Sequence, residues 1–489
     1  MKHSSKKILS MAVAAAIYAP LSAWATNGMN LEGYGPIALG MGGASMAYDN
    51  GTAAVMNNPA TLGLMNEGGR LDVALGFLGP DVKASTAGMP DAKSSADSFY
   101  MPAVGYARKT GQLTYGVGLF AQGGMGTEYA GDSFMAAGSG ETVRSEVGVG
   151  RLIAPLTYDA GNGLTVGGSI DFVWAGMDIK MAMSGAQFGD MVAALGGSQA
   201  GGTASGNMVD GMVGMMPSSA FGGPGACDPT ATTCLTNVDW ARFDFSNGSD
   251  YTGEAKGHGF AGKLGMVYKL NKQLTLGATY HSKTRLGDLE TGNAKLSMQV
   301  DWSDGTNNQA IPVSGKIAVK DFQWPATMGI GAAFQATDKL MVVADVKRIK
   351  WADAMKDFSM TFTADNVASN GGFAGATLDA VLFQKWEDQT VISLGGAYKV
   401  TDALTLRAGF NKASNPIPDT YLNALFPAIV ERHLTLGAGY QVSDASEVNF
   451  ALSKASEVSA TNPGNGSTIP AVKSTHSQLS WQAMYSHHF

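Results

Sequence analysis

Apolar and polar residues alternate with a period of two along most of the chain. The clearest runs cover 274–281, 404–411, 434–441 and 479–486. In the first run, leucine, leucine, alanine and tyrosine alternate with threonine, glycine, threonine and histidine. Successive side chains of a β-strand point to opposite faces, so this period predicts strands with one apolar face. The pattern indicates an all-β protein, either a soluble sandwich or a membrane barrel.

Fourteen such segments can be counted along the sequence. An even number suits a closed antiparallel barrel, which leaves no unpaired strand edge in lipid. The predicted strands cover about 69–79, 98–109, 113–122, 141–157, 164–178, 258–270, 274–290, 318–335, 340–352, 386–400, 404–414, 430–442, 446–458 and 475–489.

The connections between these strands differ in length at the two ends. Tight turns are predicted at 271–273, 337–339, 401–403 and 443–445, and the other connections are long, roughly 179–257, 287–318, 353–385 and 459–474. Short turns at one end and long loops at the other are typical of outer-membrane barrels, whose polar strand face lines the lumen. We therefore predict a transmembrane antiparallel β-barrel of about 14 strands over residues 69–489, with long extracellular loops, notably 179–257.

The composition excludes a disordered polyelectrolyte, which needs high charge and few apolar residues, and leaves a large all-β protein open. Charged residues make up 15% of the 489 residues, against ~25% in an average soluble domain. With 33 basic and 40 acidic residues the net charge is −7, so the chain has no basic surface for nucleic acid.

Residues 1–25 have the pattern of a secretory signal peptide. Lys2, Lys6 and Lys7 precede an apolar stretch at 8–21, and Ala23-Trp24-Ala25 gives a small-x-small cleavage site. The apolar stretch is too short to cross ~30 Å of hydrocarbon. We expect an exported protein.

Residues 26–68 do not alternate. They are rich in small residues, with one short helix predicted around 52–56. About forty such residues ahead of the first strand could fill a barrel as a plug. At the other end, Trp481, Tyr485 and Phe489 share one phase of the last predicted strand. That ending looks like the signal that the outer-membrane assembly machinery reads in bacterial barrels.

Several motifs in order resemble one family. The stretch 26–68 with Asn58-Pro59-Ala60 is similar to the N-terminal hatch of the FadL/TodX outer-membrane channels. Similar family motifs follow at 324–331, 345–351, 406–419 and 432–440. The resemblance covers essentially the whole chain after residue 25.

The resemblance implies a fourteen-stranded barrel closed by a hatch, in the outer membrane of a Gram-negative bacterium. It implies passive uptake of hydrophobic compounds, with long-chain fatty acids as the first expectation and aromatic hydrocarbons as the alternative. Substrate would be caught at the extracellular loops, pass to a lumenal pocket and leave sideways at a kinked third strand. Here Gly123, Gly124, Met125 and Gly126 stand at that kink, where the family often has Asn-Phe-Gly.

The loop 179–257 contains two apolar helical spacings. Phe188, Met191, Val192 and Leu195 form the first, and Val209, Met212, Val213 and Met216 form the second. Methionine suits a surface that accepts variable hydrophobic ligands, so these residues are candidates for an extracellular groove. The alternative is that the two faces pack on each other above the barrel.

Two further kinds of site are predicted. Cys227 and Cys234 lie in the same loop, and in an oxidising compartment they are expected to form a disulfide. A fatty-acid carboxylate in the lumen would need a cation, for which Arg144, Lys347 and Arg407 are candidates. The alternative for these charges is a mutually neutralising ladder on the barrel wall.

The sequence contains no recognisable catalytic or metal-binding motif, and we expect no enzyme activity, cofactor or metal. Three functions compete: a channel for hydrophobic solutes, a surface adhesin or receptor that uses the same long loops, and an outer-membrane lipid hydrolase, for which no Ser/His pair can be placed. A general porin is the weakest idea, because a hatch would block polar flux. The expected partners are a hydrophobic small molecule and outer-membrane lipid, including lipopolysaccharide, around a monomer.

Overall fold

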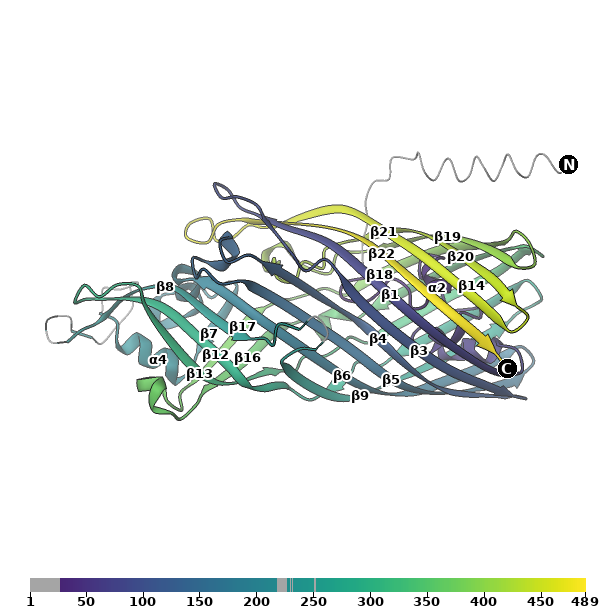
Figure 1. Ribbon diagram of the computed structural model, residues 1–489, viewed down its shortest axis with the longest axis horizontal. Coiled ribbons are helices and arrows are strands. Elements are labelled where there is room, and N and C mark those ends of the chain that lie inside the picture. Colours follow the sequence, from purple (N-terminus) through teal and green to yellow (C-terminus); the bar gives the residue numbers. More distant parts are fainter. Residues whose placement is uncertain (1–26, 218–226, 229, 231, 250–251) are drawn as a thin grey trace.

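A computed structural model describes residues 27–217, 227–228, 230, 232–249 and 252–489, so the predicted signal peptide lies outside the described residues. The chain forms one closed antiparallel barrel (Figure 1). Around the ring the strands are β1 (Gly68–Ser85), β3 (Phe99–Thr110), β4 (Leu113–Tyr129), β5 (Val143–Gly161), β6 (Leu164–Ser184), β9 (Ala255–Lys269), β10 (Leu274–His281), β14 (Thr327–Thr337), β15 (Leu340–Ile349), β18 (Gln389–Lys399), β19 (Leu404–Ala413), β20 (Arg432–Ser443), β21 (Ser446–Asn462) and β22 (Val472–His488).

Pairing of β22 with β1 closes this ring of fourteen strands, and the predicted barrel is confirmed. The outer surface of the ring is apolar. Ile170, Leu264 and Ile330 expose 71%, 66% and 65% of their surface, as expected for side chains that face lipid. Their neighbours on the other strand face point into the barrel.

Strands also continue beyond the ring at the end with the long connections (left in Figure 1). The pairing order there is β6–β8–β12–β13–β16–β17–β7. The bounds are β7 (Gly202–Ser205), β8 (Leu235–Phe245), β12 (Leu289–Trp302), β13 (Gln309–Lys320), β16 (Asp357–Ala364) and β17 (Thr377–Phe383). Two short strands are β2 (Ala92–Lys93) and β11 (Arg285–Leu286). We call the sheet from β8 to β7 the extension.

The interpretation of 179–257, 287–318 and 353–385 as loops was therefore wrong in part. These segments hold most of the extension, because their backbone groups pair with each other above the membrane. In β12 and β16 the alternation continues, with Leu296, Met298 and Val300 buried in the first and Phe358, Met360 and Phe362 in the second. The connection predicted at 459–474 is shorter, since β21 ends at Asn462 and β22 begins at Val472.

The helical elements are short. They are α2 (Pro36–Leu39), η1 (Gly51–Val55), η2 (Pro59–Leu64), η3 (Phe134–Ala136), α3 (Gly185–Met191), η4 (Ala193–Leu195), α4 (Asn207–Gly214), η6 (Trp351–Asp353), η7 (Ala368–Phe373) and η8 (Asp419–Tyr421). Among the described helices, none has the length and apolar character needed to span a membrane.

Residues 27–67, which we call the plug, lie within the barrel and contain α2, η1 and η2. Almost all of their side chains are buried. The wall provides room through glycines that face the plug: a Cβ on Gly277 would lie 1.9 Å from the Met46 carbonyl oxygen, and one on Gly409 would lie 2.1 Å from the Gly42 nitrogen. The plug backbone therefore contacts the wall at positions that tolerate no side chain.

Candidate functional site

The Asn58-Pro59-Ala60 motif fixes the plug internally and to the wall. The Asn58 side-chain oxygen accepts a hydrogen bond from the Ala60 amide at 3.1 Å and so caps η2, in which Pro59 takes the first position. The Asn58 side-chain nitrogen donates to the carbonyl oxygens of Met46 at 2.7 Å and of Met266 in β9 at 3.2 Å. One side chain thus links two parts of the plug to the barrel.

Charged side chains of the wall hold the plug at two further places. The Asp72 carboxylate accepts from the Thr52 amide at 2.7 Å and the Thr52 hydroxyl at 2.9 Å. The Asp345 carboxylate accepts from the Ser45 amide at 2.5 Å, and the Lys347 ammonium donates to the Gly43 carbonyl at 2.9 Å. Hydrogen bonds to charged groups are stronger than neutral ones, so these contacts anchor the plug.

The third strand of the ring separates from the second. Pairing of β4 with β3 ends at Leu119 and Val104, although β3 continues to Phe99 alongside β1. On its other side β4 stays paired with β5 as far as Tyr129, with a register shift between Ala121 and Gly123. The Gly-rich segment named from the sequence, 123–126, begins at this bulge.

The plug contacts the bulge directly. Asn30 and Gly123 form an isolated antiparallel bridge. Gly123 has φ +153°, and a Cβ there would lie 2.2 Å from the Met29 carbonyl oxygen, so only glycine fits. The extra residue, Gln122, donates from its side chain to Asn30 at 2.9 Å. The bulge is therefore built around the first described residues of the plug.

An opening in the wall lies between β3 and β4 above this point. Its lower limit is the last pair, Leu119 with Val104. Its upper limit is a crossing segment, where the Ser95 amide donates to the Glu128 carbonyl at 2.8 Å and the Glu128 amide donates to the Ser94 hydroxyl at 3.0 Å. The Phe99 ring lies beside Gly126, because a Cβ on Gly126 would be 3.0 Å from this ring.

A cavity of about 490 Å³ adjoins this opening. Its lining includes Met29, Asn30 and Leu31 of the plug and Phe99 and Met125 beside the opening. A second, apolar cavity of about 20 Å³ lies toward the extension and is lined by residues that include Phe322, Met355, Phe358 and Phe426. Met29 and Val147 line both cavities.

Three tryptophans pack edge to face where the ring bends into the extension. The ring centroids of Trp324 and Trp351 are 5.8 Å apart, and those of Trp351 and Trp386 are 5.2 Å apart. The Trp324 indole nitrogen donates to the Asn30 side chain at 2.8 Å. A Cβ on Gly28 would lie 2.8 Å from Trp351. This tryptophan cluster therefore holds the same end of the plug that reaches the bulge.

The three candidate carboxylate partners do not come together. Arg144 is on the outward face of β5, where it pairs with Glu146, with Glu128 at 2.7 Å and with the Ser249 carbonyl at 3.0 Å. Lys347 binds the plug backbone, and Arg407 donates to Asn449 at 2.8 Å. None of the three lines the 490 Å³ cavity. The placement of Arg144 in the lumen was wrong, because the β5 residues that face inward there are its neighbours Val143 and Ser145.

The predicted methionine groove is also absent as an open surface in the described part of the loop. The candidates Phe188, Met191, Val192, Leu195, Met212 and Met216, with Val209, are at most 7% exposed and belong to one core that includes residues of β8, β12 and β16. The first helix ends at Met191, and Val192 leaves the helical conformation. The alternative that the two faces pack on each other is right only in that both are buried, because α3 packs on β6, β7 and β8 and α4 packs on β7 and β17.

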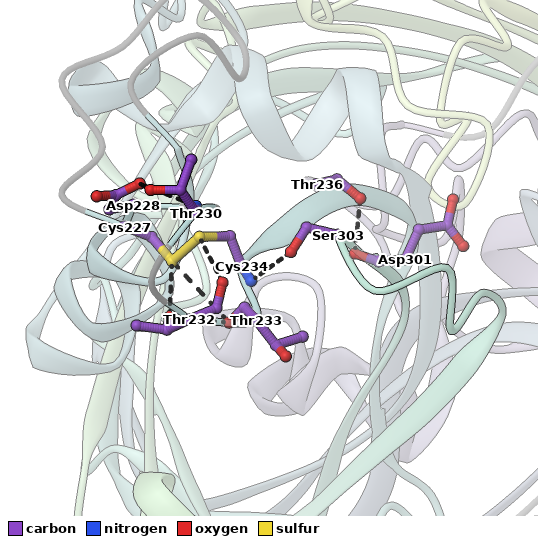
Figure 2. Close-up of a disulfide and its surroundings, with 9 residues drawn as sticks. All are labelled: Cys227, Asp228, Thr230, Thr232, Thr233, Cys234, Thr236, Asp301 and Ser303. Carbon is purple, nitrogen blue, oxygen red and sulfur yellow. Dashed lines mark hydrogen bonds between the residues drawn. A yellow bond between two sulfur atoms is a disulfide. The ribbon is translucent and has the colours of Figure 1, made fainter.

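Cys227 and Cys234 form the predicted disulfide, with Cα atoms 5.8 Å apart (Figure 2). The Cys234 amide donates to the Ser303 hydroxyl at 2.9 Å, and the Thr236 hydroxyl donates to the Asp301 carbonyl at 3.1 Å. Figure 2 shows these contacts beside the disulfide. The disulfide thus lies next to the start of β8, where β8 pairs with the end of β12.

Glu32 gives a pH-dependent prediction for plug docking. It is 2% exposed, and its Oε1 lies 3.9 Å from the Nε2 of His433 without a hydrogen bond. Burial raises the pKa of Glu32 above its ordinary value of 4.5. Because the pKa of Glu32 is higher in the folded protein than in the unfolded chain, the folded protein is most stable below pH 4.5. Its free energy of unfolding then falls as the pH rises through the raised pKa.

We therefore expect Glu32→Gln to raise the thermal midpoint of the barrel at pH 8 and to leave it unchanged near pH 4.5. Loss of heat-modifiable gel mobility, followed from pH 4.5 to 8, measures this in both proteins. An equal midpoint difference at every pH would contradict the explanation, because a purely steric effect of glutamine has no pH dependence.

Sequence reasoning missed the residues around the opening, such as Met29, Phe99 and Trp174. Their grouping depends on which strands pair and where pairing stops, and the alternating pattern does not contain that information. Within the described residues, no group of three or more His, Cys, Asp or Glu could hold a metal ion.

A closed apolar-surfaced barrel with an internal plug defines an outer-membrane channel. The model of the outer membrane protein transport family (OMPP1/FadL/TodX) matches residues 12–483. The chain therefore belongs to this family, whose members are transport channels for hydrophobic compounds in the outer membrane of Gram-negative bacteria.

Solved structures that are similar to this chain support the same family. The toluene transporter TodX of Pseudomonas putida is 30% identical, with a TM-score of 0.75 over 94% of this chain and 99% of that chain. The toluene transporter TbuX of Ralstonia pickettii is 28% identical, with a TM-score of 0.71 over 94% and 99%. An uncharacterized protein of Chlorobium limicola is 48% identical over 104 residues, which are 21% of this chain and 49% of that relative. The chain thus spans about half the length of this curated relative.

Proposed function

We propose that this protein is a passive channel for neutral hydrophobic compounds, with monoaromatic hydrocarbons as the first substrate class. The observation that carries the proposal is the lining of the 490 Å³ cavity. Among its described lining residues the one Lys or Arg is Lys256, an exposed residue at the extracellular part of β9. A buried carboxylate without a cation is costly, whereas an uncharged ring has no such cost. The toluene transporters named above support the same class.

The proposed route begins at the extension and ends at the wall. The small apolar cavity beside Phe358 and Phe426 holds about 20 Å³, room for little more than one water, so the side chains around it would have to move apart to receive the compound first. Met29 and Val147 separate it from the large cavity, so a shift of the Met29 side chain would join the two. The opening between β3 and β4 would then release the compound sideways into the membrane. Because one chain forms every part of this route, a monomer surrounded by lipopolysaccharide is sufficient.

A long-chain fatty acid is the second candidate. The large cavity continues from the plug to Lys256, and an ammonium there would pair with a carboxylate while the chain lay against apolar side chains. This observation favours an elongated amphiphile over a single ring.

The test is uptake by a Gram-negative strain that lacks its own channel of this kind, with and without this protein. Labelled toluene and a labelled long-chain fatty acid are supplied in parallel. We expect protein-dependent uptake of toluene. Uptake of the fatty acid alone would move the substrate to the second candidate. No uptake of either compound with a correctly assembled barrel would favour an adhesin or receptor.

A further inference from the structure

Three glycines lie side by side on the outer face of the wall next to the opening. Gly124 of β4 pairs with Gly148 of β5, and Gly148 pairs with Gly176 of β6. Gly148 lies on the same face of β5 as Leu152, which is 45% exposed. Gly176 lies on the same face of β6 as Trp174, which is 39% exposed. The row therefore faces away from the barrel interior. Without side chains it forms a depression over β4 and β5 that ends at β6, where the Gly253 backbone covers Gly176. We call this depression the glycine trough.

The trough has a defined wall and end. A Cβ on Gly150 would lie 2.2 Å from the Trp174 ring, so this indole lies flat over Gly150 and borders the row on its membrane side. At the far end, a Cβ on Gly176 would lie 2.8 Å from the Gly253 nitrogen. Lys256 pairs with Gly176 in the register of β9 and β6. The trough thus has a floor of glycine backbone, the Trp174 indole at one side and Lys256 at its end, and the Glu146 carboxylate, paired with Arg144, lies beside it in β5.

The trough is continuous with the cavity at the plug. One and the same cavity is lined by Met29 and Leu31 inside the barrel and by Gly148, Trp174 and Gly176 on its outer face. Because β3 and β4 are not paired beyond Val104 and Leu119, the 490 Å³ cavity extends from the barrel interior to the outer face of the wall. A compound that leaves through the opening therefore meets the trough before it meets bulk lipid.

We propose that the glycine trough is an external binding subsite for the transported compound, which lies on the glycine backbone against the Trp174 indole before it enters the membrane. A planar aromatic molecule fits this floor, and its ring would pack against the indole. The subsite rests on the proposed channel function and adds an exit step and a size limit to it. Its occupant is the transported compound, because the trough is continuous with the cavity that holds it.

Gly148→Leu tests the trough without straining the fold, because a Cβ at Gly148 would have no atom within 4 Å. The leucine side chain would fill the trough. One methylene in an apolar pocket changes the discrimination between ligands by about tenfold or more, so we expect toluene uptake to fall about tenfold. The matched control is Gly396→Leu in β18, where the nearest atom is the Met341 carbonyl oxygen at 3.5 Å. Gly396 lies between the lipid-exposed Leu394 and Tyr398. This control should transport like the wild type.

A second measurement reports occupancy directly. Both cysteines of the chain are in the disulfide, so Gly148→Cys and Gly396→Cys each introduce a single thiol. In outer-membrane vesicles, toluene should slow the reaction of N-ethylmaleimide with the thiol at position 148 several-fold and leave the reaction at 396 unchanged.

The outcomes separate the two proposals. If Gly148→Leu takes up toluene normally and toluene does not protect the thiol at position 148, the trough is not a binding subsite. Uptake by the wild type would still support the channel function. A thiol at 148 that toluene does not protect but that reacts faster after lipid removal would assign the trough to a lipid acyl chain and overturn its assignment to the transported compound. Absence of wild-type uptake would overturn the channel and the trough together.

Discussion

Replacing Gly123 with valine is expected to lower uptake about tenfold while the barrel still assembles. A side chain at φ +153° costs about 1–3 kcal/mol of backbone strain. In addition, the new Cβ would lie only 2.2 Å from the Met29 carbonyl oxygen, which is too close for the two atoms to keep their present positions. The bulge would be lost and β4 would be free to pair with β3 above Leu119. If the free-energy difference between the separated and the paired arrangement of β3 and β4 shifts by about 1.4 kcal/mol, the fraction of molecules with an open wall changes tenfold.

The measurement is uptake of labelled toluene at matched levels of heat-modifiable barrel in the outer membrane. Gly138→Val is the control, since Gly138 has φ +82° in the loop after β4 and a Cβ there has no atom within 4 Å. It carries similar backbone strain without touching the plug. If both variants transported equally well, the bulge at Gly123 would have no part in transport.

The barrel could be predicted from the sequence because lipid imposes a simple rule. All fourteen predicted segments correspond to strands of the ring, since only apolar side chains face hydrocarbon and their partners must point inward. Two of those segments, 274–290 and 318–335, are interrupted in the structure, at the bends between β10 and β12 and between β13 and β14. Thr284 and Trp324 bond across these bends, a contact between distant segments that a local pattern cannot show.

The error at Arg144 shows where that rule stops. Along the membrane part of β5, Leu152 and Leu156 face outward and Arg151 faces inward. Farther along the same strand the polarity inverts, with Val147 and Val149 buried on the inward face and Arg144 on the outward one. Above the membrane the outside is polar and the inside holds the apolar cavity. The inversion near Gly148 and Gly150 thus marks the level at which the wall leaves the lipid.

The candidate site was harder to predict than the fold for the same reason. The sequence indicated the glycines at 123–126 and the motif at Asn58, and the structure places the first at the bulge and the second at a plug–wall contact. The trough needs three glycines from three strands at one level. Their alignment follows from the register between β4, β5 and β6, and a one-residue change of register would scatter them.

A buried charge cluster carries the largest expected effect on stability. Asp171 of β6 pairs inside the barrel with Lys263 of β9 and with Arg151 of β5, the latter at 2.8 Å, and all three are at most 3% exposed. Asp171 also accepts from the Ser169 hydroxyl at 2.7 Å. Charge balance of this kind is what the sequence offered as the alternative for Arg144, Lys347 and Arg407, although none of those three belongs to this cluster. One anion thus compensates two buried cations.

Asp171→Asn removes the negative charge but keeps the size of the side chain. Two uncompensated cations would remain in the interior, and breaking a buried pair typically costs about 3–5 kcal/mol. We expect the urea midpoint of the barrel in lipid vesicles to fall accordingly. Asp171→Asn combined with Lys263→Met should recover most of the loss, because it removes one of the stranded charges. Asp91→Asn, which breaks an exposed pair with Lys83 of 3.1 Å, should change stability by less than about 1 kcal/mol. An equal loss for Asp91→Asn and Asp171→Asn, or no recovery in the double variant, would show that the cluster does not stabilise the barrel by charge balance.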